Sequence, residues 1–148
     1  MLPGFKATSK NEAIEKMIEA VADAYPQRVT DVDSVKKAVF ACEASMPTGL
    51  DCGIAVPHGR TDSVTGIIGA VAVIDNSENE NGTIADYETI DHSAIQIIVL
   101  TVAPETAQTP YLQLMAFISR ALRSNGGHEK LVACRTEDEM RRFFHSAK

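Results

Sequence analysis

The sequence predicts one α/β domain, covering residues 1–148, in which helices pack on the faces of a mixed β-sheet. Three observations lead to this prediction. Segments with the apolar periodicity of helices lie towards both ends of the chain, and short apolar runs typical of buried strands lie between them. A chain of 148 residues with 45% hydrophobic and 23% charged residues is long enough to bury one core. No internal repeat or linker divides it.

Composition excludes several classes of function. A net charge of -6 without a concentrated basic face argues against a nucleic-acid partner. No segment approaches the roughly 18 apolar residues that a membrane-spanning helix needs, and Met1 to Lys10 lack the layout of a signal peptide. The three scattered cysteines do not form a disulfide framework. We therefore expect a cytoplasmic protein with no direct membrane insertion.

Two helices are predicted before the first strand. Ser9 and Glu12 form a capping box, and apolar residues follow at helical spacing until Pro26 ends the helix. The second helix is expected to begin near Asp31 or Asp33. Neither helix carries a chemical motif, so both are expected to cover one side of the sheet. The apolar residues of the two stripes are Ile14, Met17, Ile18, Val21, Ala22, Val32, Val35, Ala38 and Val39.

Three strands are predicted in the middle of the chain. Residues 54–56 form a short buried strand, residues 66–74 a central strand, and residues 95–102 a strand rich in β-branched residues. The polar, glycine-terminated segment 75–82 is typical of a solvated turn. Residues 83–93 are interpreted as a short edge hairpin.

Helices are predicted again towards the C-terminus. Thr109-Pro110 is a favoured helix start, and Gly126-Gly127 ends that helix. A short helical stretch over 129–134 follows, and a capping box at 136–139 opens the last helix, which Met140, Phe143 and Phe144 anchor. The first of these helices has a wide apolar stripe and is expected to be well buried; its members are Leu112, Leu114, Met115, Phe117, Ile118, Ala121 and Leu122.

His58 is the main candidate for a reactive residue. Pro57 disfavours the helical conformation for Val56, and Gly59 lets another backbone, or a phosphate, approach closely. The histidine is thus expected at the end of a rigid strand. A neutral imidazole has one ring nitrogen with a lone pair that can attack phosphorus, so His58 could accept a phosphoryl group. The alternative interpretation is a histidine that only caps the end of the strand.

The segment around His58 resembles that of a known family. Residues 48–59, with the sequence TGLDCGIAVPHG, are similar to the phosphorylation-site segment of enzyme IIA components of the bacterial phosphoenolpyruvate-dependent sugar phosphotransferase system. The resemblance is to the fructose/mannitol and nitrogen-regulatory branch. That branch has an Arg-Glu pair, then Thr-Gly, a further glycine, and an apolar strand that ends in Pro-His-Gly or Pro-His-Ala. The likeness extends more weakly over nearly the whole chain.

The resemblance implies both a fold and a function. It implies a central mixed sheet flanked by helices on both faces, of the phosphotransferase/anion transport protein-like kind. His58 would accept a phosphoryl group from the phosphohistidine carrier protein HPr and pass it to a IIB partner, with no cofactor and no metal. Thr48, Gly49, Gly59 and Arg60 would surround the phosphoryl oxygens, although Thr48 and Gly49 could serve only the turn and Arg60 only the surface.

Two departures from the family pattern bear on this function. Cys42 precedes Glu43 where the family has the arginine of its Arg-Glu pair, and Tyr111 precedes Leu112 where the family has a second histidine. Tyr111 can donate one hydrogen bond but carries no positive charge. The chain could therefore be a regulatory or binding module that keeps the fold, transfers phosphoryl groups weakly or not at all, and docks to a target protein.

Other reactive groups give weaker signals. Cys52 and His58 could suggest a cysteine hydrolase, but the motif gives the cysteine no special place. His92 is either a loop residue or a substitute for the second histidine, and His128 and His145 are expected to be exposed. No two histidines have metal-ligand spacing, so no metal site is predicted. Cys42 and Cys134 are interpreted as core residues, and the oligomeric state is left open.

Overall fold

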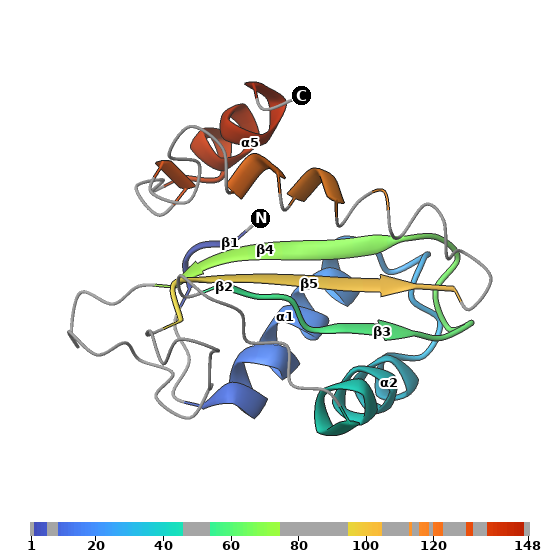
Figure 1. Cartoon of the computed structure of the whole chain (residues 1–148). Coiled ribbons are helices and arrows are strands. Elements are labelled where there is room, and N and C mark those ends of the chain that lie inside the picture. The colour runs from blue at the N-terminus through green and yellow to red at the C-terminus, as the bar shows by residue number, and fades with distance from the viewer. Residues whose placement is uncertain are drawn as a thin grey trace.

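A computed structural model shows a five-stranded sheet with helices on both faces (Figure 1). The structure describes residues 2–5, 9–45, 54–74, 95–104, 113, 116–118, 120–122, 130–131 and 136–146. In chain order, the elements are β1 (Leu2–Phe5), α1 (Lys10–Ala24), α2 (Val32–Ser45), β2 (Ile54–Ala55), β3 (His58–Arg60), β4 (Ile68–Ile74), β5 (Ile97–Ala103) and α5 (Glu137–Ser146). Short helical pieces also lie within 113–122 and at 130–131.

The sheet is mixed, as the sequence predicts. The strand order is β1-β4-β5-β2, and β3 also pairs with β5. β4 and β5 are antiparallel, whereas β1 with β4, β2 with β5 and β3 with β5 are parallel. The strands predicted at 66–74 and 95–102 are confirmed with slightly different bounds. β5 is therefore the central strand against which both β4 and the two short strands near His58 pair.

β1 is absent from the sequence prediction, and the prediction is wrong there. Pro3 and Gly4 interrupt the four residues of β1 and are both uncommon inside strands. β1 nevertheless pairs with β4 because it lies at the edge of the sheet, where proline is tolerated. Its register shifts between Leu2, opposite Ala72, and Phe5, opposite Ile74.

The core consists of two layers, one on each face of the sheet. Along β5 the side chains alternate: Ile98, Leu100 and Val102 pack with α1 and α2, whereas Ile97 and Val99 pack with the C-terminal helical segments. The expectation that the first two helices cover one side is thereby confirmed (Figure 1). Buried residues of the second layer include Ile118, Ala121, Leu122, Leu131 and Met140.

Both predicted capping boxes begin helices. The Ser9 hydroxyl accepts the backbone N–H of Glu12 at 3.1 Å and starts α1. The Thr136 hydroxyl accepts the backbone N–H of Glu139 at 3.2 Å and starts α5. These polar contacts satisfy backbone donors that the first turn of a helix leaves unpaired.

The start of α2 is set by Asp31, one of the two predicted residues. Its carboxylate accepts the Ser34 hydroxyl at 2.8 Å and the Ser34 backbone N–H at 3.2 Å. These two bonds, the hydroxyl's first, lower the pKa of the Asp31 carboxyl below its ordinary value because they favour the charged form.

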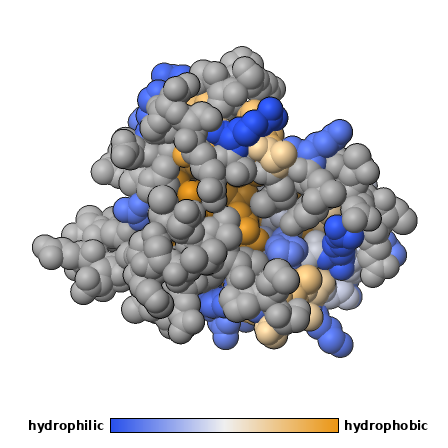
Figure 2. Space-filling view, viewed as in Figure 1, coloured by the Kyte–Doolittle hydropathy of each residue, from blue (hydrophilic) through white to orange (hydrophobic). Residues whose placement is uncertain are grey.

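Figure 2 shows apolar side chains towards the middle of the viewed face and hydrophilic ones around them. This arrangement agrees with a sheet placed between two helical layers. The turn predicted at 75–82, the hairpin at 83–93, the helix start at Thr109-Pro110 and the stop at Gly126-Gly127 lie outside the described residues.

Candidate functional site

The site is built on a strand that runs through Pro57. β2 pairs Ile54 with Ile97, and β3 pairs His58 with Thr101 at the same sequence offset, so the two short strands form one parallel ladder on β5. Pro57 has no N–H and interrupts this ladder, but its carbonyl still accepts the Thr101 N–H at 3.1 Å. The prediction that the strand ends before His58 is therefore wrong: the strand resumes at the histidine.

Gly59 holds β3 against α2. A Cβ atom on Gly59 would lie 2.9 Å from Val39 Cγ2 and 3.0 Å from the Val39 backbone nitrogen. The sequence predicted that Gly59 allows a close approach either by another backbone or by a phosphate. In the structure the backbone of α2 makes this close approach. Because successive side chains of a strand point to opposite faces, His58 points away from α2.

The His58 ring is half-buried, and its Nδ1 atom contacts the backbone. Nδ1 lies 3.0 Å from the carbonyl oxygen of Val56. A carbonyl can only accept a hydrogen bond, so this contact requires the hydrogen on Nδ1. In the neutral imidazole the lone pair then lies on Nε2, which is the nitrogen able to attack an electrophile.

Arg60 lies on the same face of β3 as His58, two residues further along. Positions two residues apart in a strand are separated by about 7 Å, which a long arginine side chain can span. Arg60 is exposed, whereas Gly59 between the two is buried. The role predicted for Arg60, to supply positive charge beside a phosphoryl group on His58, stays a prediction.

Three predicted site residues, Thr48, Gly49 and Tyr111, lie outside the described residues. Cys42, which stands at the position of the family's arginine, is half-buried in α2, so it is less enclosed than the predicted core residue. Cys52, His92, His128 and Cys134 also lie outside the description, as does the side chain of His145.

Glu43 forms an ion pair that the sequence interpretation missed. Its carboxylate is 5% exposed and lies 3.0 Å from Nζ of Lys10, which is 23% exposed. The pair joins the first residue of α1 to the last turn of α2. A buried carboxylate without a cation costs several kcal/mol, on the order of 3–5. No periodicity signal reveals such a pair, because its partners lie more than thirty positions apart in the sequence.

Thr101 was also missed, although a signal was available. It is the polar residue within the otherwise apolar β5, and it is 1% exposed. A hydroxyl in an apolar strand indicates a local polar contact, because burying it without one costs about 1–3 kcal/mol.

Neither a metal centre nor a membrane segment emerges from the described part of the chain. No group of three or more His, Cys, Asp or Glu residues gathers there in a way that could hold a metal ion. Among the same residues, no helix combines the length and the apolar character needed to cross a bilayer.

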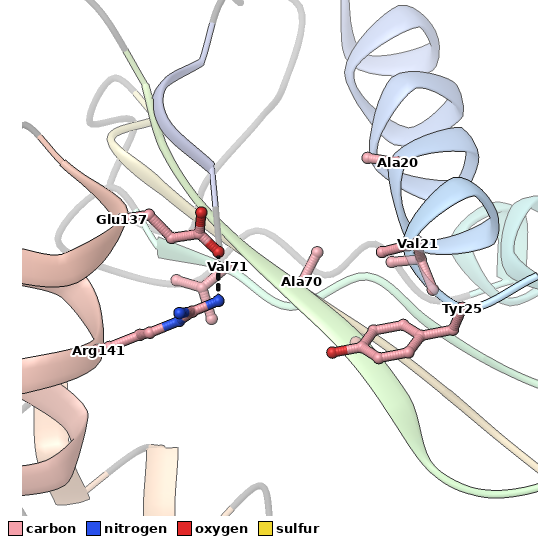
Figure 3. A pocket seen from close by; sticks show the side chains of 9 residues that line it. Ala20, Val21, Tyr25, Ala70, Val71, Glu137 and Arg141 are labelled. Carbon is pink, nitrogen blue, oxygen red and sulfur yellow. Dashed lines mark hydrogen bonds and ion pairs between the residues drawn. The ribbon is translucent and has the colours of Figure 1, made fainter.

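A pocket of about 510 Å³ lies away from the histidine, beside the first half of β4 (Figure 3). Its floor includes Ala70 and Val71, with Tyr25, the residue after α1, on one side and the ion pair of Glu137 and Arg141, 2.7 Å apart, on the other. His58 is not among the residues that line it. The pocket is therefore separate from the candidate site.

A family of known proteins matches nearly the whole chain. The sequence model described as "Phosphoenolpyruvate-dependent sugar phosphotransferase system, EIIA 2" matches residues 3–147. The nitrogen regulatory protein of Bradyrhizobium diazoefficiens is 29% identical over 135 residues, which are 91% of this chain and 82% of that protein. The fructose-specific EIIA component of Haloferax volcanii is 28% identical over 124 residues, which are 84% and 75% of the two chains.

A solved structure has the same fold. In the Escherichia coli complex of mannitol enzyme IIA with phosphorylated enzyme IIB, the matching chain is 21% identical and superposes with a TM-score of 0.76. The match covers 98% of this chain and 93% of that one. The mixed sheet between two helical layers is thus an arrangement already known in solved structures.

Proposed function

Because the chain belongs to the EIIA 2 family of the phosphoenolpyruvate-dependent sugar phosphotransferase system, we propose that His58 carries the phosphoryl group. Nε2 of His58 attacks the phosphorus of the phosphohistidine of HPr; the N–P bond in HPr breaks as the new one forms. The group then passes from Nε2 to a IIB partner. The domain spans 1–148, acts in the cytoplasm and needs no cofactor.

The observation that carries this proposal is the contact between His58 Nδ1 and the Val56 carbonyl at 3.0 Å. The contact keeps the hydrogen on Nδ1 and leaves the lone pair on Nε2, at the half-buried edge of the sheet. Phosphoryl transfer needs chiefly positioning and charge neutralisation. The rigid strand supplies the first. Arg60, together with Thr48, Gly49 and Tyr111, is proposed to supply the second.

A labelling experiment tests the proposal. The protein is incubated with enzyme I, HPr and phosphoenolpyruvate labelled in its phosphate. One acid-labile phosphate per chain is expected on the wild type, none on His58→Gln, and a wild-type level on the control His145→Gln. An unlabelled wild type, or a label that survives His58→Gln, would reject the proposal.

A regulatory role is the second candidate. Two observations favour it: the relative from Bradyrhizobium diazoefficiens is named a nitrogen regulatory protein, and Cys42 replaces the positively charged residue expected beside the site. In this role the protein docks to a target, and transfer itself is slow. A target captured equally by the wild type and by His58→Ala supports this role, whereas capture that requires the phosphoryl group speaks against it.

The two roles are distinguished by restoring the missing groups. If the natural chain is impaired in transfer, the double variant Cys42→Arg with Tyr111→His gains at least about tenfold in labelling rate, since each charge-assisted contact to a phosphate contributes on the order of 1–3 kcal/mol. An unchanged rate shows that the natural chain is already a competent carrier.

A further inference from the structure

The first half of β4 has an open edge. β5 pairs with one side of β4, from Ile68 to Val73. On the other side, β1 begins at Leu2, opposite Ala72, and pairs with the second half of β4. Within the described part of the chain, no strand therefore pairs with the outer edge of residues 68–71. Such an edge presents backbone N–H and C=O groups to which another strand can hydrogen-bond.

The ladder between β4 and β5 shows which backbone groups point outwards. The Ile74 N–H donates to the Gln96 carbonyl at 2.9 Å, so Ile74 directs its N–H towards the β5 side. In an antiparallel ladder this direction alternates from one residue to the next. Gly69 therefore directs its N–H and C=O groups, and Val71 its N–H group, away from β5 into the open edge. An added strand would hydrogen-bond to these groups.

The pocket of about 510 Å³ follows this open edge (Figure 3). Ala70 belongs to the core layer of α1, whereas Val71 packs against the layer of the C-terminal segments, and both line the pocket. A space lined from both faces of the sheet passes round the edge of the strand. Four residues of edge are about 13 Å long, which matches one extended segment of roughly four or five residues.

The two walls of the pocket differ in chemistry (Figure 3). The α1 wall is mainly apolar and consists of Ala20, Val21, Ala24 and Tyr25. The α5 wall carries the ion pair of Glu137 and Arg141, whose side chains are 49% and 64% exposed. A guanidinium has five N–H donors, so Arg141 can hold Glu137 through Nη2 and a second carboxylate through the others. Because successive side chains of a strand point to opposite faces, a strand between these walls would alternate apolar and polar side chains.

A second copy of the chain fits this edge less well than an isolated segment. In a second copy the same edge lies between its own α1 and α5, so the helices of the two copies would meet before the two edges could pair. A single extended segment brings no such layers. β1 is an example of this pairing within the chain, because it joins the same edge at Ala72 although it contains Pro3 and Gly4. Backbone pairing at this edge thus tolerates residues that strands seldom contain.

We propose that the open edge of β4 binds an extended segment of a partner protein, which adds a strand in line with β1. Its apolar side chains lie against Ala24 and Tyr25, and a carboxylate between them on the other face contacts Arg141. Main-chain hydrogen bonds supply the affinity of such strand addition, and the alternate side chains supply the specificity. The site does not include His58 and does not rest on the role proposed for that residue.

The probe for this site is the capped pentapeptide Ser-Val-Glu-Val-Ser, added to the ¹⁵N-labelled full chain at millimolar concentration. We expect saturable shifts of the Gly69 and Val71 amides, and no binding by the same peptide methylated at every amide nitrogen. Ala24→Trp fills the pocket from the exposed end of α1 and should weaken binding at least about tenfold. Asn11→Trp is the matched control: it adds the same side chain, without a change in charge, at an exposed position of α1 that does not line the pocket.

A second pair of variants tests the polar wall without adding bulk. Arg141→Gln should weaken binding several-fold because the peptide carboxylate loses its charged partner. Arg142→Gln removes the same charge from the next residue of α5, which is also exposed but does not line the pocket, and should bind as the wild type does. Equal weakening by both arginine variants would show that only overall charge matters and would overturn the proposed site.

The remaining outcomes also decide the inference. Equal binding of the methylated peptide, unchanged binding by Ala24→Trp, or the absence of saturable shifts would each overturn it. A dimer of the peptide-free chain that dissociates in Ala24→Trp would assign the edge to a second copy and overturn it as well. His58→Gln should bind the peptide as the wild type does, so this result stands or falls separately from phosphoryl labelling.

Discussion

Replacing Gly59 by alanine tests how the histidine strand is held against α2. The added Cβ would lie 2.9 Å from Val39 Cγ2, 3.0 Å from the Val39 nitrogen and 3.2 Å from its Cα. Ordinary van der Waals contact begins near 3.4 Å, so β3 and α2 must separate by about 0.4–0.5 Å. Two of the three contacts involve helix backbone, which cannot rotate away as a side chain can.

The expected loss follows from the size of that overlap. Overpacking of this kind destabilises by about 1–3 kcal/mol. For a chain of this length each kcal/mol lowers the melting temperature by roughly 2–4 °C, so Gly59→Ala should melt roughly 2–12 °C below the wild type. Adding Val39→Ala should not restore the wild-type melting temperature, because it removes the contact with Cγ2 but keeps those with the backbone and truncates a fully buried side chain.

Thermal unfolding followed by circular dichroism measures this loss, and Gly66→Ala is the matched control. A Cβ at Gly66 meets nothing within 4 Å, and the backbone there is not in the left-handed region, so that variant should equal or slightly exceed the wild type. Gly59→Ala should also be labelled more slowly, since His58 moves with its strand. Equal melting temperatures for the two glycine variants would refute the close approach of α2.

Three further predictions concern the ends of helices. Lys10→Met leaves the Glu43 carboxylate buried without this cation and should cost about 3–5 kcal/mol in urea unfolding, and adding Glu43→Gln should recover most of that loss. Asp31→Ala should destabilise at neutral pH. Because Ser34 lowers the pKa of Asp31 in the folded state, the stabilisation by the charged carboxylate is complete above the ordinary carboxyl value and is lost as the pH falls through the lowered pKa, so the difference from wild type should shrink in acid. Thr136→Ala removes the cap of α5 and should cost about 1 kcal/mol at any pH, without changing labelling.

Elements with strong local signals were predictable from the sequence. Ser9 and Thr136 each satisfy a first-turn donor within three residues, so their helices are specified by a few neighbouring side chains. β4 and β5 are apolar runs, so each could be predicted as a strand without knowing which strands pair with it. β1 was missed because its pairing with β4 outweighs the poor strand preference of Pro3 and Gly4.

The sequence predicted which histidine belongs to the candidate site, but not which contacts hold that histidine in place. The sequence around His58 indicated a reactive histidine at the end of a strand; the structure places it in β3 and adds the Val56 contact that fixes its tautomer. The hydroxyl of Thr101 stands out in an apolar strand, but its neighbour across the sheet could not be predicted because register between strands is a non-local property. Its place opposite His58 depends on a pairing across about forty residues that no pattern within either strand encodes.

The construction of β3 indicates how a phosphoryl carrier of this kind would work. Hydrogen bonding through Pro57 ties the strand to β5, Gly59 brings it against α2, and the Val56 carbonyl holds the ring. The His58 ring, the proposed acceptor, therefore has little freedom of its own, and in this proposal a donor and an acceptor protein must each bring phosphorus into line with the same nitrogen. In such a carrier the conformational entropy of positioning the nucleophile is lost once, when the protein folds, and not each time a partner protein binds. Transfer in both directions then depends on docking of the partner and not on rearrangement of the carrier.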